Sequence, residues 1–171
     1  MSGPSTQSSL EGFLSLSQEL TAFSIFELRG TGQADAYLAT VVEVVGSEVL
    51  DDLVRTYAAI DAPEPAQREA QIRRHILGDP KLGPIARNVI KLWFVGVWYQ
   101  LPPAWSNAYG ARDKDTTFTV SASAYTEGLL WKTIGANPPG AKSPGYGSWA
   151  DSPRIPVPGT RNQYLQLRNG R

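Results

Sequence analysis

The chain has 171 residues, which is enough for one domain with a sizeable hydrophobic core and short for two. Its 16 lysines and arginines balance its 16 aspartates and glutamates, so no excess of positive charge indicates nucleic acid or an anionic membrane as a partner. The absence of cysteine excludes disulfides, thiolate metal sites, iron–sulfur clusters and cysteine nucleophiles.

The N-terminal segment has little to bury. Residues 1–9 are mostly serine, glycine, proline and glutamine, which predicts a disordered leader. The stretch MSGPSTQSSLEGF lacks the basic and apolar regions of a secretory signal and carries no twin arginine, so we expect no export signal in this chain.

The most apolar run, residues 89–101, is too short for a membrane span. It contains Lys91, and a bilayer span needs roughly 20 apolar residues. We therefore expect a buried helix there.

Helices are predicted over three segments of the N-terminal part, where apolar residues recur at helical spacing. The first is residues 10–23. The second is residues 37–45, although its β-branched residues leave a strand possible. In the third, residues 49–57, we expect Ser47 to be the N-cap.

A solvated helix is predicted over residues 64–77, in which Glu69 and Arg73 are spaced for an exposed ion pair. Asp79 and Pro80 then have the N-cap and N1 chemistry for a further helix.

This further helix has the clearest core face of the chain, formed by Ile85, Val89, Leu92, Trp93 and Gly96. We expect it to end at Pro102 and Pro103, because proline removes a donor and restricts the residue before it. Phe118 and Val120 alternate with threonines, which allows one short strand or an extended arm.

The last apolar pattern, residues 125–134, predicts a final helix that ends at Gly135. Prolines then recur between residues 138 and 158, so no regular element can extend far. The expected fold class is mainly α: a compact helical domain of about five helices over residues 10–135, followed by a long irregular Pro/Gly-rich tail over residues 136–171.

Two short motifs resemble dinucleotide-binding loops. GTGQAD, residues 30–35, has Asp35 at the third glycine position, and GYGSWA, residues 145–150, lies between prolines. A phosphate-binding loop needs a strand before it and a helix after it, and neither motif has this context. We therefore predict no cofactor-binding residues in this chain.

The titratable residues give no convincing catalytic set. His75 is the single histidine, and its place on a polar helix after two arginines favours a surface residue. The acid pairs Asp51–Asp52 and Asp113–Asp115 are interpreted as solvated carboxylates, since acids that work as a catalytic pair usually come from different elements. We predict no catalytic residue and no metal ligand.

Several aromatic residues lie at or beyond the ends of predicted elements: Trp98, Trp105, Tyr109, Tyr146 and Trp149. Large aromatics in such places are often interface anchors, because they bury much area with little loss of rotamer freedom. The alternative is that the tail folds back on the helices of its own chain.

Three blocks stand in order along the chain: LSQELTAF (16–23), IKLWFVGVW (90–98) and AYTEGLLW (124–131). The third is followed by PPGAKSPGYGSWADSP. In this combination the chain resembles the small (gamma) subunit of bacterial FAD-dependent sugar and polyol dehydrogenase complexes, of the gluconate, sorbitol and fructose dehydrogenase type (gluconate 2-dehydrogenase subunit 3-like). The resemblance covers the chain from about Leu10 to Pro153.

The resemblance implies a noncatalytic accessory subunit. Such a subunit binds a large flavoprotein of the glucose-methanol-choline oxidoreductase type, stabilises it and assists its folding or export. FAD and the catalytic histidine would belong to that large subunit, and electrons would pass to a cytochrome c or another acceptor. The expected partner-binding residues are Trp98, Trp105, Tyr125, Trp131, Pro138, Pro139, Tyr146 and Trp149.

The chain departs from the family in lacking the twin-arginine signal, which implies either a cytoplasmic complex or export with another, signal-bearing subunit. Residues 102–117 and 154–171 have no counterpart in the family pattern. The alternative function is a freestanding protein-interaction or carbohydrate-binding module, in which Trp98, Trp105, Tyr146 and Trp149 form a stacking surface. An independent enzyme is the third possibility.

Overall fold

The computed structural model describes residues 6–138 and 141, and over these residues the chain is mainly α-helical with little strand. The predicted mainly-α fold class is thus confirmed, while the irregular tail predicted over residues 136–171 lies almost entirely outside the described residues. In chain order the elements are α1 (Thr6–Thr21), α2 (Ile25–Gly30), α3 (Ala34–Val45), α4 (Ser47–Ala58), α5 (Pro65–Ile72), the π-helix η1 (Arg73–Leu77), α6 (Leu82–Val95), β1 (Val97–Trp98), α7 (Pro103–Tyr109), β2 (Phe118–Thr119), α8 (Ala122–Thr126) and α9 (Leu129–Thr133).

The chain divides into two compact units, Met1–Gly128 and Leu129–Arg171. We call the first unit the body. The sequence placed the end of the helical domain at residue 135, whereas the division falls after Gly128, so that α9 belongs to the second unit. No helix among the described residues is long and apolar enough to cross a membrane.

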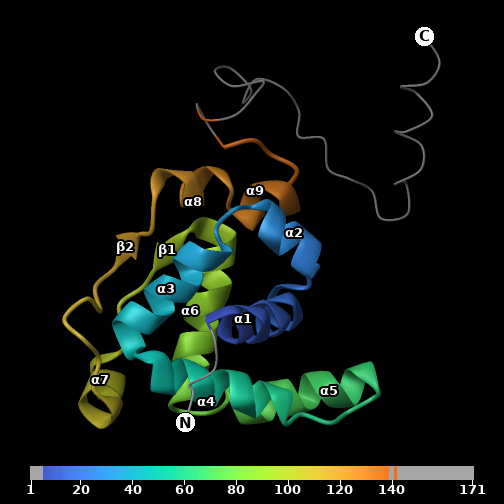
Figure 1. The fold of residues 1–171 in the computed structure, drawn as a ribbon, viewed down its shortest axis with the longest axis vertical. Helices are drawn as coiled ribbons and strands as arrows, with labels where there is room; N and C mark the ends of the chain where they lie inside the picture. The colour runs from blue at the N-terminus through green and yellow to red at the C-terminus, as the bar shows by residue number, and fades with distance from the viewer. Residues whose placement is uncertain (1–5, 139–140, 142–171) are drawn as a thin grey trace. The chain divides into compact units, whose positions relative to one another are not determined.

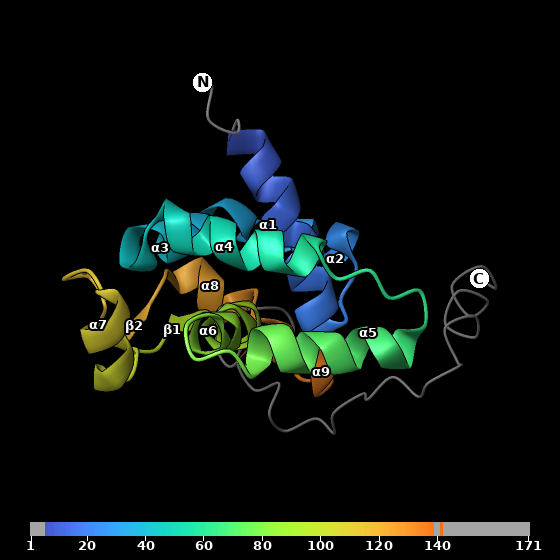
Figure 2. The same ribbon diagram turned by 90° about the horizontal axis from the view of Figure 1, so that it is seen from below.

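Helix α6 lies at the centre of the body, with α1, α3 and α4 packed around it (Figures 1 and 2). Its predicted apolar face is fully buried: Ile85, Val89, Leu92 and Trp93 have no exposed surface. Leu16 of α1, Val41 of α3 and Leu53 of α4 are equally buried. Burying each such side chain contributes about 1.5–3 kcal/mol, so this helical face accounts for much of the stability of the body.

The tryptophan of α6 holds three helices together. The Trp93 ring stacks on Phe13 of α1 with 6.2 Å between centroids and meets Tyr37 of α3 edge-on at 5.0 Å. Burial raises the pKa of Tyr37, and the negative charge of Glu127 adds to this effect. The phenol therefore stays neutral in the core.

The helices of the N-terminal part follow the predicted periodicity, with differences at their ends. Residues 34–45 form a helix, not a strand. The first helix begins at Thr6, inside the segment predicted as a leader, and residues 1–5 lie outside the described residues. Ser47 is the first residue of α4 and makes no capping hydrogen bond, because Gly46 occupies the N-cap position.

The core helix ends earlier than the proline pair predicted. Gly96 adopts a left-handed conformation with φ of 69° directly after Val95 and ends α6 there. The chain then extends as β1, which pairs antiparallel with β2, Val97 opposite Thr119 and Trp98 opposite Phe118. The short strand predicted at Phe118 thus exists, and its partner comes from residues that were expected to be helical.

The final predicted helix is divided in two. Helix α8 ends at Thr126 and α9 begins at Leu129. A Cβ on Gly128 would lie 2.6 Å from the Phe94 carbonyl oxygen, so the backbone at this point passes too close to α6 for a side chain. The break at Gly128 is therefore set by contact with α6, and the predicted end at Gly135 follows α9, where Gly135 adopts a positive φ of 66°.

Gly96 offers a test of this close packing. A Cβ on Gly96 would lie 2.6 Å from the carbonyl carbon and oxygen of Ala124, in addition to the strain of its positive φ. We expect Gly96→Ala to lower the free energy of unfolding by about 2–5 kcal/mol, measured by urea denaturation. Gly110, with φ of 76° and open space around it, is the matched control: Gly110→Ala should cost only the backbone strain, about 1–2 kcal/mol. Equal losses would contradict the close approach.

Candidate functional site

The residues predicted to contact a partner fall into three groups. Trp98 and Trp105 are buried in the body, and Tyr125 is 40% exposed on α8. Trp131 is half-buried and Pro138 is buried, both in the second unit. The remaining three lie outside the described residues: Pro139, Tyr146 and Trp149.

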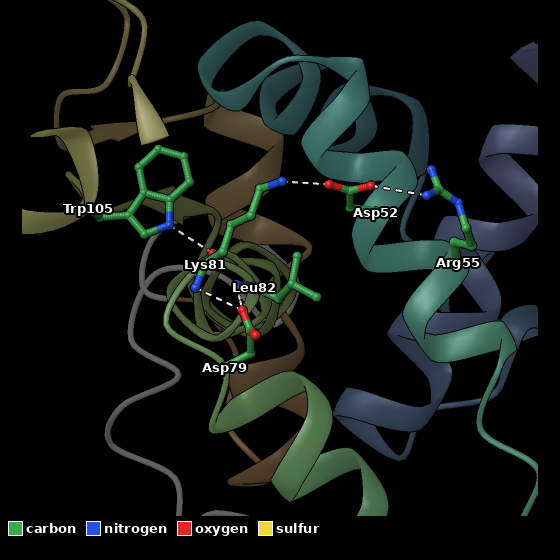
Figure 3. A network of polar contacts seen from close by, with 6 residues as sticks. All are labelled: Asp52, Arg55, Asp79, Lys81, Leu82 and Trp105. Atoms are coloured by element: carbon green, nitrogen blue, oxygen red, sulfur yellow. Dashed lines mark hydrogen bonds and ion pairs between the residues drawn. The ribbon is translucent and has the colours of Figure 1, made fainter. Parts of the chain in front are cut away.

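The two tryptophans of the body are held inside it by their indole N–H groups. Trp98 has no exposed surface, and its Nε1 donates to Asp115 Oδ1 at 3.0 Å. Trp105 is 3% exposed, and its Nε1 donates to the Lys81 carbonyl oxygen at 2.7 Å (Figure 3). Neither ring is available to fill a partner's pocket or to stack on a sugar, which corrects the expectation that they are surface anchors.

Asp115 is buried, in contrast to the solvated carboxylate that the sequence suggested. It is 6% exposed and also accepts hydrogen bonds from the Leu101 backbone N–H at 3.1 and 3.2 Å. A buried carboxylate needs such donors to offset the cost of leaving water. Asp115 therefore ties the loop after β1 to the loop before β2 and has a structural role.

We expect Trp98→Phe to destabilise the body. The change keeps an aromatic ring but removes the indole donor to Asp115, and a lost hydrogen bond to a buried charged group costs about 1.5–3 kcal/mol. Trp105→Phe is the control, because its indole donates to a neutral carbonyl and its loss should cost about 1 kcal/mol. Urea denaturation followed by circular dichroism measures both, and a smaller loss for Trp98→Phe than for Trp105→Phe would contradict this role.

The three sequence blocks of the resemblance meet in the fold. Phe23 of the first block packs edge-on against Phe94 of the second, with 6.1 Å between ring centroids. Gly96 of the second block lies against the backbone of Ala124 in the third, and Gly128 lies against the Phe94 carbonyl oxygen. We call this meeting point, at the C-terminal end of α6, the block junction. The sequence singled out the blocks but contained no signal for their contact.

A groove lies at the opposite end of α6. It has a volume of about 550 Å³ and is lined by Arg55, Thr56, Ala59, Ile60, Gln71, His75, Asp79 and Leu82. We call it the α4–η1 groove, because α4 and η1 supply residues to its walls. His75 is exposed, as the sequence predicted, and lines this groove. Arg55, Thr56 and Gln71 were not singled out from the sequence, since polar residues on amphipathic helices carry no motif.

Charged side chains fix the N-terminal end of α6 beside the groove (Figure 3). Lys81 Nζ contacts Asp52 Oδ2 at 2.5 Å, and Arg55 Nη1 contacts Asp52 Oδ1 at 3.3 Å. Asp79 Oδ1 accepts from the backbone N–H groups of Lys81 and Leu82 at 2.8 and 2.7 Å. Asp79 thus bonds to the backbone just before α6, but the helix begins at Leu82 with Lys81 at the N-cap position, two residues later than the Asp79–Pro80 start that the sequence predicted.

The hydrogen bond from Lys81, together with the charges of Lys81 and Arg55, holds the pKa of Asp52 below its ordinary value. A lowered folded-state pKa means that the carboxylate stabilises the fold above the ordinary carboxyl pKa. This stabilisation is lost as the pH falls through the folded-state pKa.

We therefore expect Asp52→Asn to lower the free energy of unfolding near pH 7 by no more than about 1 kcal/mol, since the pair is partly exposed. The difference from the wild type should shrink as the solution is acidified through the carboxyl range, as measured by urea denaturation over a pH series. The neighbouring Asp51 makes no ion pair with the described residues, so Asp51→Asn serves as the control. A difference that does not change with pH would contradict the ion pair.

No group of three or more histidine, aspartate and glutamate side chains among the described residues is placed to hold a metal ion. Comparisons with models of protein families, with curated proteins and with solved structures found no match.

Proposed function

We propose that this chain is a noncatalytic accessory subunit that binds and stabilises a large FAD-dependent sugar or alcohol dehydrogenase subunit. The proposal rests first on the three sequence blocks and their order. FAD and the reacting groups would belong to the large subunit, and the present chain would contribute a folded body and an extended contact segment.

The observation that carries the proposal is the block junction. The blocks are separated by long stretches of sequence, yet Phe23, Phe94, Gly96, Ala124 and Gly128 pack against one another in the body. A chance similarity has no reason to fall on residues that form one packed contact. Their meeting supports the interpretation that the blocks mark one structural unit.

The position of the junction also favours a role for the tail. The chain leaves the body at Gly128, directly at the junction, and continues into the Pro-rich segment that holds the remaining expected contacts. These are Trp131, Pro138, Pro139, Tyr146 and Trp149. Prolines reduce the entropy lost when an extended segment binds, and aromatic side chains fill pockets on a partner. Tyr125, 40% exposed on α8, lies next to Ala124 and extends the expected contact onto the body.

The proposal is tested by isolating the full chain from its own cells with whatever binds it. We expect a larger flavin-containing protein that oxidises a sugar or polyol with an artificial electron acceptor. That protein, then expressed alone, should show lower yield and flavin content than when it is expressed with this chain. Equal yield, flavin content and activity in both cases would refute the proposal.

The contact segment is tested in the full chain by Tyr146→Ala combined with Trp149→Ala. Loss of two aromatic anchors should weaken binding to the flavoprotein at least tenfold, measured by titration calorimetry. Tyr164→Ala is the control, because Tyr164 lies in the same tail but beyond Pro153, where the resemblance ends. Unchanged affinity in the double variant would exclude these two residues as anchors.

A further inference from the structure

The α4–η1 groove is lined by polar side chains with unused hydrogen-bonding groups. Three of these side chains form no hydrogen bond within the described residues: Thr56, Gln71 and His75. Thr56 and Gln71 are half-buried, and His75 is exposed. A hydroxyl, a carboxamide and a neutral imidazole each both donate and accept hydrogen bonds. These three side chains therefore suit a ligand that also has donors and acceptors.

The two charged side chains of the lining also keep free groups. Arg55 has a side chain that is 73% exposed, and its contact with Asp52 at 3.3 Å uses one of its five donors (Figure 3). Asp79 accepts both of its backbone hydrogen bonds through Oδ1, while Oδ2 accepts none from the described residues. Arg55 and Asp79 give the groove one charge of each sign, so the lining favours a ligand without charge.

Aliphatic side chains complete the lining. Ile60 and Leu82 are 7% and 6% exposed and provide apolar surface, together with Ala59. None of the described residues that line the groove is a phenylalanine, tyrosine or tryptophan, on which a nucleobase or another flat ring would stack. The volume of about 550 Å³ lies within the range of sites for small molecules. The lining thus fits a ligand with an aliphatic group and uncharged polar groups.

We propose that the α4–η1 groove binds an uncharged, extended segment of a partner polypeptide that carries an aliphatic side chain. Each residue of such a segment offers one backbone N–H and one C=O group. Its C=O groups accept from Arg55, its N–H groups donate to Asp79, and its aliphatic side chain lies on Ile60 and Leu82. Because donors and acceptors recur at every residue of the segment, no fixed distance between Arg55 and Asp79 is needed. This site goes beyond the proposed function and does not depend on it.

The single histidine of the chain lines the groove and is a direct reporter of binding. The ring signals of His75 in the full chain are followed by NMR at fixed pH during titration with N-acetyl-L-leucinamide, which has the two amide groups and the side chain of a leucine inside a polypeptide. Two probes are the comparisons: N-acetyl-L-leucine, which has a carboxylate in place of one amide, and N-acetylglycinamide, which lacks the aliphatic side chain. We expect N-acetyl-L-leucinamide to shift the His75 signals saturably and to bind at least fivefold more tightly than either comparison, because the carboxylate is repelled by Asp79 and the glycine probe makes no contact with Ile60 and Leu82.

Two variants test the polar contacts. Arg55→Met and Asp79→Asn should each weaken the binding of N-acetyl-L-leucinamide about fivefold, as expected for one lost hydrogen bond. Asparagine keeps an oxygen for the two backbone hydrogen bonds but has a donor in place of Oδ2. Arg74→Met is the control, because Arg74 is exposed on η1 and does not line the groove. No response of His75, equally tight binding of either comparison probe, unchanged affinity in Arg55→Met and Asp79→Asn, or an equal loss in Arg74→Met would overturn the proposal.

Discussion

The body depends on the burial of Trp93. Its ring lies between Phe13 of α1 and Tyr37 of α3, so one side chain sets the distance of two helices from α6. This core also buries three polar side-chain atoms that form no hydrogen bond within the described residues: Trp93 Nε1, Tyr37 Oη and Ser17 Oγ. Each such atom costs about 1–3 kcal/mol, which the aromatic contacts and the burial of large apolar surfaces must offset.

Trp93 fixes the middle of α6, and the two ends of this helix have different surroundings. At its C-terminal end, glycines allow backbone segments to approach within contact distance, and Phe94 meets Phe23. At its N-terminal end, Asp79 accepts hydrogen bonds from the backbone N–H groups of Lys81 and Leu82, and Lys81 joins α6 to α4 through Asp52. The first arrangement excludes water and suits a rigid structural contact. The second is charged and partly exposed to solvent.

The features predicted correctly from the sequence are those that depend on local periodicity. The predictions were wrong where contacts between residues far apart in the chain determine where a helix ends. The core face of α6 and the Glu69–Arg73 ion pair, at 2.7 Å, follow from side-chain spacing, as does the helical pattern of residues 37–45, for which a strand had also been possible. The end of α6 was misplaced because Pro102 is a strong local signal, whereas Gly96 acts through its approach to Ala124. For the same reason the break at Gly128, which is set by Phe94, could not be found from spacing alone.

Trp98 and Trp105 show that the candidate site, too, could not be predicted fully from local sequence. Position near the end of an element suggested that Trp98 and Trp105 were surface anchors, but each indole finds an acceptor from a distant segment, Asp115 or the Lys81 carbonyl. The block junction lies at the C-terminal end of α6, whereas the α4–η1 groove lies at its N-terminal end. Helix α6 has 14 residues and is about 20 Å long, so the two places are far enough apart to act independently. A substitution at one end of α6 that alters the other end would therefore have to act through Trp93 and the helices packed on it.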